Sequence, residues 1–264
     1  MDNQKELEIE AIIKEAGKIM LSARYKNMNV DEKTGCANFV TEYDVLVQKF
    51  LEEKFLELIP EVKFLAEEEG EDENKVGDGL TFIIDPIDGT SNFMYNMNLS
   101  AISVAIAKDK KTVFAAIYNP YADEYYTAER GKGAYLNGNK ISVSSVKASS
   151  SLALIGTAAY YKDSIGDKTV KMFEKVFYSF GDIRRCGSAA IDLCNIAKGS
   201  ASAFFEYVLS PWDFAAGALI VTEAGGHITD FKGESLLDRY EKSTVLAANA
   251  VVFDEAKEIV EKIY

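Results

Sequence analysis

The stretch TFIIDPIDGTSN, residues 81–92, joins a short apolar run directly to two acidic side chains. The run 81–84 suits a buried strand, yet it ends at Asp85, and a second carboxylate follows at Asp88. Pro86 has no backbone N–H to donate, so we expect the chain to leave the sheet just after Asp85. The carbonyl group of Ile87 is then free to face something other than a neighbouring strand.

The residues after Asp88 indicate a turn that opens a short helix. Gly89 permits a tight turn, and the backbone N–H groups of Gly89, Thr90 and Ser91 could hold a phosphate at the start of that helix. Two carboxylates and a free carbonyl are the ligands that a hard cation such as Mg²⁺ prefers. The same residues are also ordinary turn formers, with Asp88 or Thr90 as a helix N-cap. The stretch alone leaves both interpretations open.

Length and composition bound the class of protein. The 264 residues, with 48% hydrophobic and 27% charged, are enough for one large domain or two modest ones that share a cleft. The opening MDNQKELEIE is acidic and lacks the apolar core of a signal peptide, and no apolar run approaches the ~18 residues of a membrane span. We therefore expect a cytoplasmic protein that does not bind membranes. Cys36, Cys186 and Cys194 include no CxxC pair and indicate reduced thiols.

Charge and histidine content exclude several kinds of chemistry. The formal net charge of −13 repels nucleic acid, and it also repels a phosphorylated substrate unless bound cations reverse the local sign. His227 is the single histidine and lies in EAGGHITD, where a structural role is expected. A second histidine is missing, which excludes phosphatases that pair two histidines and histidine-rich zinc sites. The chemistry must therefore come from carboxylates and metal.

The first part of the chain, residues 1–149, is predicted to be an α+β half that binds metal. Helices are expected at 4–28 and 41–58, with the polar loop 29–35 and Lys33 between them. Thr41 is a good N-cap and Asp44 completes a capping box, which is the structural alternative for Asp44. Strands are expected at 62–66, 81–84, 99–107, 112–119, 124–127 and 133–136, the last two with the Asn137-Gly138 hairpin signal behind them.

The second part, residues 150–264, alternates strands and helices and is predicted to be a smaller α/β half. The expected strands are 152–157, 183–185, 201–205, 227–230 and 244–247, and the expected helices are 167–179, 188–197, 211–224 and 254–263. The chain contains no internal repeat and no obvious linker. We therefore expect the halves to share one extensive interface, with the active site in the cleft between them.

Acidic side chains recur where regular elements meet loops. The strand 62–66 delivers Glu67, and the helix that starts with Pro211 and Trp212 carries Asp213. Asp213 alone could simply interact with the helix dipole. Together with Asp85 and Asp88, however, these residues supply about as many bridging carboxylates as a two-metal site needs.

At this point the sequence resembles the inositol monophosphatase family of Mg²⁺-dependent, lithium-sensitive sugar phosphatases. The resemblance covers nearly the whole chain and is carried by IIDPIDGTSNF at 83–93 and PWDFAAGALIVTEAGG at 211–226, with weaker matches in AEEEG at 66–70 and RGKGAYLNG at 130–138. It implies a layered α-β-α-β-α sandwich and a homodimer. A haloacid dehalogenase-type phosphatase would need a DxD pair where this chain has DxxD.

The resemblance also implies roles for individual residues. One Mg²⁺ would be held by Glu67, Asp85 and the carbonyl of Ile87, a second by Asp85, Asp88 and Asp213, and a third, weaker ion by Glu67 and waters. Thr90, paired with Asp44, would orient the attacking water and help to deprotonate it. The phosphate would meet Asp88 and the N–H groups of Gly89 and Thr90, and the polyol would meet Ala189, Glu206 and Asp213. The segment 38–41 reads NFVT where many relatives have DLVT, a departure close to Asp44 and Lys33.

Two classes of function follow from these observations. The first is Mg²⁺-dependent hydrolysis of myo-inositol monophosphate or a similar small polyol phosphate, favoured by the compact length and by Glu206. Its rivals within the class are fructose-1,6-bisphosphatase, 3′-phosphoadenosine 5′-phosphate phosphatase, and NADP(H) or histidinol phosphatase. The second is a non-catalytic regulatory role in which the same fold binds another protein or RNA. The intact carboxylate set favours catalysis, and the charge of −13 argues against RNA.

Overall fold

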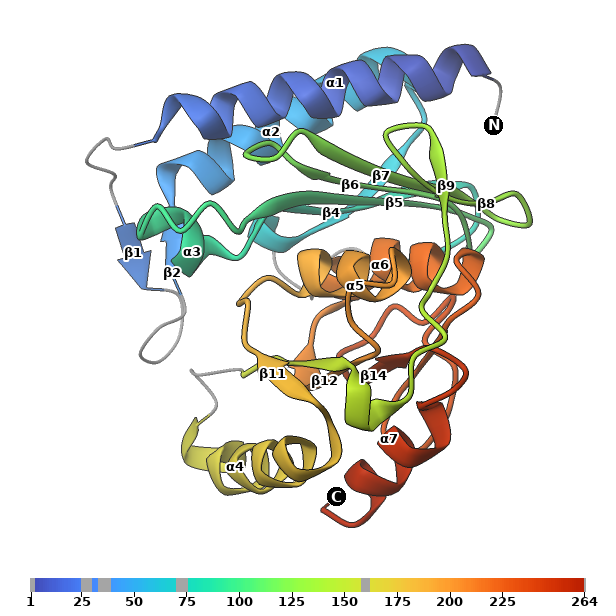
Figure 1. Cartoon of the computed structure of the whole chain (residues 1–264). Helices are drawn as coiled ribbons and strands as arrows, with labels where there is room; N and C mark the ends of the chain where they lie inside the picture. Colours follow the sequence, from blue (N-terminus) through green and yellow to red (C-terminus); the bar gives the residue numbers. More distant parts are fainter. Residues whose placement is uncertain (1–2, 25–29, 33–38, 70–75, 158–161, 264) are drawn as a thin grey trace.

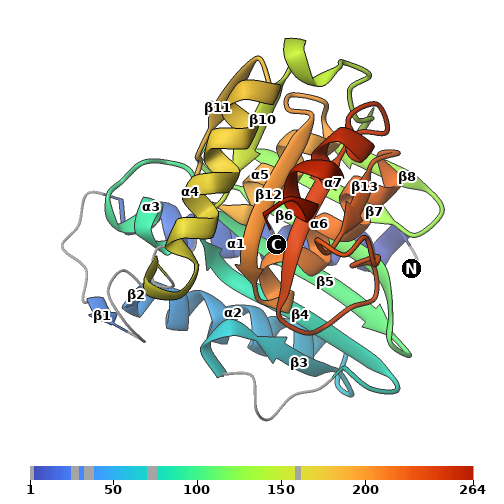
Figure 2. The same cartoon turned by 90° about the horizontal axis from the view of Figure 1, so that it is seen from below.

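The computed structural model describes residues 3–24, 30–32, 39–69, 76–157 and 162–263, which stack in five layers (Figure 1). Helices α1 (Asn3–Ser22) and α2 (Glu42–Leu58) cover the outer face of a seven-stranded sheet. Helices α5 (Ala189–Ala197) and α6 (Pro211–Glu223) lie between this sheet and a five-stranded sheet. Helices α4 (Lys162–Ser179) and α7 (Phe253–Glu261) cover the far side of the second sheet, as Figure 2 shows. The predicted α-β-α-β-α sandwich is confirmed.

The seven-stranded sheet is built from consecutive strands in the order β3-β4-β5-β6-β7-β8-β9. Its pairs are antiparallel except β3 with β4, which are parallel, so the predicted antiparallel sheet carries one parallel edge strand. Asn137 and Gly138 adopt positive φ values of 48° and 77°, as a two-residue hairpin turn requires. The bounds are β3 (Lys63–Ala66), β4 (Leu80–Asp88), β5 (Ala101–Lys108), β6 (Lys111–Asn119), β7 (Glu124–Glu129), β8 (Gly133–Leu136) and β9 (Asn139–Ile141).

The five-stranded sheet has the order β11-β10-β12-β14-β13. Strand β10 pairs in parallel with β11 and β12, whereas β14 is antiparallel to β12 and β13. Because the helices α4 and α5 connect the parallel strands, the predicted α/β character of this half is confirmed. The bounds are β10 (Leu152–Ile155), β11 (Asp182–Arg184), β12 (Ala203–Leu209), β13 (His227–Thr229) and β14 (Ser243–Ala248).

Short elements complete the chain. Strands β1 (Val30–Glu32) and β2 (Phe39–Thr41) form a small antiparallel pair that the sequence patterns did not predict. Helix α3 (Thr90–Met94) follows β4 directly, and the 3₁₀ turns η1 (Glu67–Glu69) and η2 (Ala148–Ser150) follow β3 and precede β10. The predicted loop residue Lys33 lies outside the described residues.

Two predicted ends of strands were wrong in a way that bears on the site. The chain does not leave the sheet after Asp85, because β4 continues to Asp88 and pairs again with β5 beyond an irregularity in register at Pro86 and Ile87. The strand predicted to end at Phe205 likewise runs on to Leu209, so Glu206 lies within β12 and not at its end. In both cases an antiparallel neighbour supplies backbone partners that the local sequence does not reveal.

Two helix ends also differ from the prediction. Helix α1 ends at Ser22 and not at residue 28, although residues 25–29 lie outside the described part of the chain. Helix α4 begins at Lys162, five residues before the predicted start at 167. Neither difference changes the layers.

The central helices are packed tightly between the two sheets. Of α6, Phe214, Leu219 and Ile220 are fully buried, and a Cβ atom at Gly217 would lie 2.3 Å from a methyl carbon of Leu193 in α5. Only glycine allows the two helices to approach this closely. The starts of α5 and α6 are thereby fixed next to the end of β4.

The first sheet uses residues up to Ile141 and the second begins at Leu152, so the change of sheet falls in the predicted region. The division of the chain at 149 and 150 into two domains stays a prediction. Among the described residues, no helix has the length and apolar character needed to span a membrane.

Candidate active site

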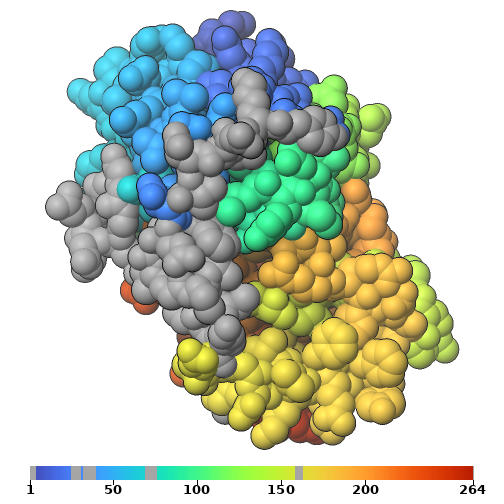
Figure 3. All heavy atoms as spheres, turned by 90° about the vertical axis from the view of Figure 1, so that its left-hand side faces the viewer, coloured from blue at the N-terminus to red at the C-terminus, as the bar shows by residue number. Residues whose placement is uncertain are grey.

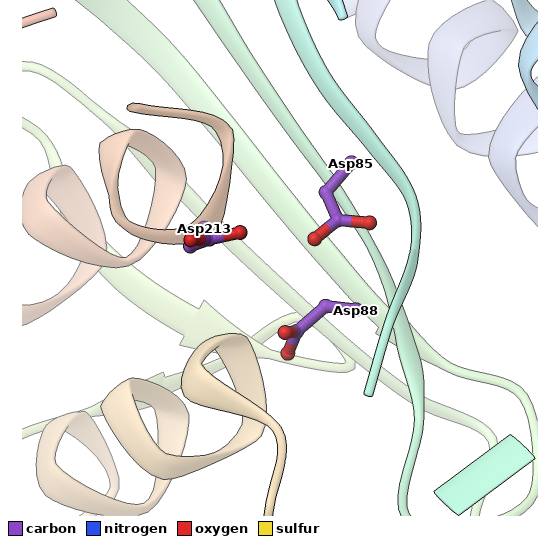
Figure 4. Close-up of side chains that lie close together, drawn as sticks. All are labelled: Asp85, Asp88 and Asp213. Carbon is purple, nitrogen blue, oxygen red and sulfur yellow. The ribbon is translucent and has the colours of Figure 1, made fainter. Parts of the chain in front are cut away.

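Three aspartate side chains converge where β4 meets the first turn of α6. Asp85 and Asp88 come from the end of β4 and Asp213 from α6, and each points a carboxylate toward the other two (Figure 4). One oxygen atom of each lies within 4.8 Å of the others. The residues that the sequence separates by more than a hundred positions thus form one cluster.

Local geometry explains how each aspartate is aimed. In the irregular turn of β4, the N–H of Ile87 donates to Oδ1 of Asp85 at 3.0 Å. In α6, Pro211 begins the helix, and Asp213 completes a capping box in which the N–H of Ser210 donates to its Oδ2 at 2.7 Å. One oxygen of each side chain is therefore held by backbone while the carboxylate faces the cluster.

Asp88 is held by the start of α5. Its Oδ2 accepts a hydrogen bond from the hydroxyl of Ser188, the N-cap residue, and another from the N–H of Ala190 at 2.8 Å. The predicted substrate contact Ala189 lies between these two donors. The N-terminus of α5 therefore stabilises the negative charge of Asp88.

The cluster concentrates negative charge in a buried place. Burial, followed by the charges of Glu67, Asp88 and Asp213, raises the pKa of Asp85 well above its usual range. Burial raises the pKa of Asp88 to about 6, although the hydrogen bonds from Ser188 and Ala190 act in the opposite direction. Burial and the charges of Glu67 and Asp88 also raise the pKa of Asp213 well above its usual range.

Glu67 follows β3 directly and begins η1, so the sheet holds it beside the aspartates as predicted from the strand. It is half-buried, and its charge acts on Asp85, Asp88 and Asp213. Within the described part of the chain, no lysine or arginine forms a salt bridge with any of the three aspartates. Oxygen donors without a protein counter-charge fit a hard cation.

Asp44 serves two partners at once. Its Oδ2 accepts from the N–H of Thr41 at 2.8 Å and from the Thr41 hydroxyl, so the predicted capping box is confirmed. Its Oδ1 lies 3.3 Å from the hydroxyl oxygen of Thr90, which is also 3.2 Å from the carbonyl oxygen of Ile87. The capping role and the pairing with Thr90 are therefore compatible, because each uses a different oxygen.

The turn at Gly89 depends on glycine. Gly89 is the N-cap of α3 and has φ +87°, and a Cβ atom there would lie 2.9 Å from the carbonyl oxygen of Leu99. The next turn of α3 is tied to the second half, since Asn92 donates to the carbonyl of Cys186 at 2.8 Å. Figure 3 shows the surface of this region, where the green residues around α3 lie against the orange residues of the second half.

Glu206 is a buried carboxylate beside the aspartate cluster. Its side chain is 7% exposed and has no hydrogen-bonding partner among the described residues. Burial, followed by the charges of Asp192 and Asp213, raises its pKa well above the usual range. A Cβ atom at Gly156 would lie 1.5 Å from Oε2 of Glu206, so the carboxylate packs directly on the backbone that follows β10.

Sequence reasoning missed two charged residues next to Glu206. Asp192 lies in α5, is 1% exposed and has an Oδ1 atom without a partner, and burial raises its pKa to about 7. Arg185 is exposed and donates from Nε to the hydroxyl of Thr157 at 2.9 Å, and its charge lowers the pKa of both Asp192 and Glu206. The sequence does contain a signal for Asp192, because this carboxylate stands between Ile191 and Leu193 in a predicted helix that is otherwise apolar there.

Comparisons with known proteins agree with this arrangement. The model of the inositol monophosphatase family matches residues 2–264. An inositol-1-monophosphatase of Rhizobium meliloti is 34% identical over 258 residues, 96% of this chain and 94% of the relative. A fructose-1,6-bisphosphatase/inositol-1-monophosphatase of Aquifex aeolicus is 33% identical over 269 residues, 99% and 98% of the two chains. The crystal structure of the extragenic suppressor protein suhB from Bartonella henselae aligns with a TM-score of 0.89 at 30% identity, covering 98% of this chain and 99% of that one.

Proposed function

Because this chain belongs to the inositol monophosphatase family and is a phosphoric monoester hydrolase, we propose that it hydrolyses myo-inositol monophosphate in a Mg²⁺-dependent reaction. The products are inositol and inorganic phosphate. The observation that carries the proposal is the buried cluster of Asp85, Asp88 and Asp213, whose oxygens lie within 4.8 Å of one another.

The donor set supports Mg²⁺ as the resident ion. Every candidate ligand is an oxygen atom, from Glu67, Asp85, Asp88, Asp213 and the carbonyl of Ile87, and hard cations prefer such ligands. The raised pKa values of the aspartates indicate that the site needs positive charge to be fully ionised at neutral pH. We propose two to three ions per site. When bound, they would supply the charge that neutralises a phosphate dianion and lowers the pKa of a water molecule.

The protein's own groups bind and orient the phosphate and move a proton. The N–H groups of Gly89 and Thr90 would donate to the phosphoryl oxygens from the turn that only glycine allows. The Thr90 hydroxyl, 3.3 Å from Oδ1 of Asp44, would orient the attacking water and pass its proton to that carboxylate. Glu67, whose charge acts on all three aspartates, would be a further acidic group beside this water.

The leaving group would lie on the side of α5 and β12. Glu206 is a buried carboxylate whose hydrogen-bonding capacity is unused among the described residues, so it suits the hydroxyl group of a polyol. The backbone at Ala189 and the carboxylate of Asp213 border the same space. A second phosphate on the substrate would lie beside the carboxyl groups of Glu206 and Asp192 and would be repelled when these are ionised, which favours a monophosphate.

One observation favours fructose 1,6-bisphosphate as a second candidate. The exposed guanidinium group of Arg185, next to Glu206, is a group that could bind a second phosphate. A relative that covers nearly the whole chain carries both activities in its name. Inhibition by lithium, a homodimeric assembly, a cytoplasmic location and the absence of nucleic acid among its partners complete the proposal.

A substrate panel tests the proposal directly. Phosphate release would be measured on inositol 1-phosphate, fructose 1,6-bisphosphate, 3′-phosphoadenosine 5′-phosphate and NADP, first in EDTA and then with excess Mg²⁺, with and without lithium. We expect release only with Mg²⁺, fastest on inositol 1-phosphate and inhibited by lithium. Faster release from another compound of the panel would change the assigned substrate but would leave the proposed metal dependence in place. Release from none of them, with Mg²⁺ still bound, would contradict catalysis of these reactions and favour a regulatory role.

A further inference from the structure

A groove of about 620 Å³ lies between α1 and the β6–β8 part of the seven-stranded sheet. Its lining includes the charged residues Glu6, Glu10, Lys14 and Asp123 and the aromatic residues Phe114 and Tyr125. Helix α1 covers the face of the sheet that points away from α6, so the groove is separated from the aspartate cluster by the sheet itself (Figure 1). Nothing in the proposed phosphatase reaction uses these residues.

Tyr125 places an unused hydroxyl group against this groove. The residue is 5% exposed, and its hydroxyl oxygen is buried without a hydrogen-bonding partner among the described residues. Burial, together with the charges of Glu10 and Glu6, raises its pKa above the usual range, which places the hydroxyl beside these two carboxylates. A buried hydroxyl without a partner is costly, so a ligand that donates a hydrogen bond to it would be favoured.

The hydroxyl is held in place by a rigid hairpin. The N–H of Tyr125 donates to the side-chain oxygen of Asn137 at 2.8 Å, and Asn137 donates in turn to the carbonyl of Asp123 at 2.9 Å. The ring also packs edge-on against Tyr118, with centroids 6.1 Å apart. Because these contacts fix the ring, the hydroxyl cannot turn away to find solvent.

The charges of the groove are not balanced. Lys14 pairs with Glu10 at 2.8 Å, and its Nζ atom also lies 5.6 Å from the centroid of the Tyr125 ring. Glu6 and Asp123 form no salt bridge with any described residue, and Oε1 of Glu6 is buried without a partner. Glu6 does share a hydrogen bond with Glu129, which pairs with Lys132 outside the groove, and Asp123 accepts one from Tyr118 at 2.9 Å. The charge of Lys132 also acts on Glu6 from outside the groove, whereas Lys14, the lysine that lines the groove, pairs with Glu10 and with neither Glu6 nor Asp123.

We propose that this groove binds an aliphatic diamine or triamine. Two ammonium groups would pair with the carboxylates of Glu6 and Asp123, and one of their N–H groups would donate to the Tyr125 hydroxyl. The methylene groups between them would contact Phe114, and the ammonium group of Lys14, which lies over the Tyr125 ring, shows that a cation is accepted beside this ring. The side chains of the groove therefore complement both the charge and the chain of such a ligand.

A bare metal ion fits this groove poorly. In the described part of the chain, the only group of three or more ligand residues whose atoms converge within 4.8 Å is Asp85, Asp88 and Asp213. The groove carboxylates do not converge in this way, although Ca²⁺ and Mg²⁺ need several oxygens at once. Its volume is also about twenty times the roughly 30 Å³ that one water molecule takes in the liquid.

Calorimetric titration of the full chain, saturated with Mg²⁺ and in about 0.15 M NaCl to screen weak surface attraction, tests the proposal. The probes are spermidine, putrescine and, as a monoamine, butylamine. We expect one site per chain, with spermidine and putrescine bound more tightly than butylamine. Tyr125→Phe removes only the hydroxyl and should weaken spermidine at least about tenfold, the effect of one hydrogen bond from a charged donor. Asp123→Asn keeps an acceptor for Tyr118 and should weaken spermidine more than butylamine.

Tyr95→Phe is the matched control, because Tyr95 is 70% exposed, follows α3 and is not among the residues that line the groove. It should bind spermidine as the unaltered chain does. Absence of saturable binding would overturn the proposal. It would also be overturned if Tyr125→Phe and Asp123→Asn bound spermidine as tightly as the unaltered chain does. Displacement of spermidine by additional Mg²⁺ would likewise overturn it, since the amine would then occupy the aspartate cluster. Circular dichroism shows whether each variant is folded. If Tyr125→Phe does not fold, the spermidine affinity of Asp123→Asn decides whether the proposal holds.

Discussion

Replacing Asp88 by asparagine removes one negative charge from the aspartate cluster and keeps the volume of the side chain. The pKa of Asp88 is raised from 3.8 to about 6, which corresponds to about 3 kcal/mol of lost stability once the carboxylate is ionised. The folded pKa lies above the unfolded one, so this loss is absent below pH 3.8 and complete above pH 6. The asparagine oxygen still accepts from Ser188 and Ala190, and the pKa of about 6 already includes the effect of these two hydrogen bonds.

Without metal, at pH 8, the Asp88→Asn variant should therefore be more stable than the unaltered chain by about 3 kcal/mol. For a chain of this size that raises the melting temperature by about 6–12 °C. In Mg²⁺ the order should reverse, because the variant has lost a ligand, and phosphate release should be abolished.

Scanning calorimetry in EDTA and in Mg²⁺, at pH 8 and pH 4, measures these effects together with phosphate release. The exposed residue Asp78 provides the control variant Asp78→Asn, which should show neither effect. A melting temperature of metal-free Asp88→Asn at or below that of the unaltered chain at pH 8 would refute the electrostatic reasoning. Equal stabilisation of both proteins by Mg²⁺ would refute the assignment of Asp88 as a ligand.

Three further variants address the proton path, the leaving-group side and the buried charge of α5. Glu206→Ala should raise the KM for inositol 1-phosphate about tenfold, through the loss of one charge-assisted hydrogen bond, and should leave the KM for p-nitrophenyl phosphate unchanged. An equal rise in KM for both substrates would contradict the role of Glu206 in binding the polyol. Thr90→Ala should lower kcat at least about tenfold with Mg²⁺ binding unchanged by calorimetry, whereas Thr90→Ser keeps the hydroxyl and most of the activity. Asp192 has a pKa of about 7 in the folded protein, above its value of 3.8 in the unfolded chain, so the folded state loses stability as the pH rises through 7 and the side chain ionises. Asp192→Asn should therefore melt at a higher temperature than the unaltered chain at pH 8.5 and at the same temperature at pH 4. An equal difference in melting temperature at both pH values would contradict this.

Much of the fold was predictable because the relevant signals are local. The periodicity of α2, the capping box of Thr41 and Asp44, and the Asn137-Gly138 turn all depend on residues within a few positions of one another. Strand and helix order then followed from alternation, and the layers followed from the resemblance. The predicted ends failed where a partner strand decides them, as for β4 beyond Pro86 and β12 beyond Phe205.

The candidate site divides in the same way. The residue types at Glu67, Asp85, Asp88 and Asp213 indicated a metal site from the sequence, because each was predicted to lie where a regular element meets a loop. The same reasoning did not find Asp192 or Arg185, because their effect on Glu206 comes from the neighbours that the fold gives them.

The sequence by itself determined which groups this protein can offer: carboxylates in place of histidines, a glycine turn before a short helix, and a capping box at Asp44. Only the tertiary structure decided which of them meet. It brings Asp213 within 4.8 Å of β4, places the start of α5 on Asp88, and buries the hydroxyl of Tyr125 beside the acids of α1. The physical reason is that hydrogen bonding and backbone preference act between near neighbours in the chain. Burial and electrostatic repulsion act between groups that are neighbours in space, and these depend on how two sheets and the helices between them pack.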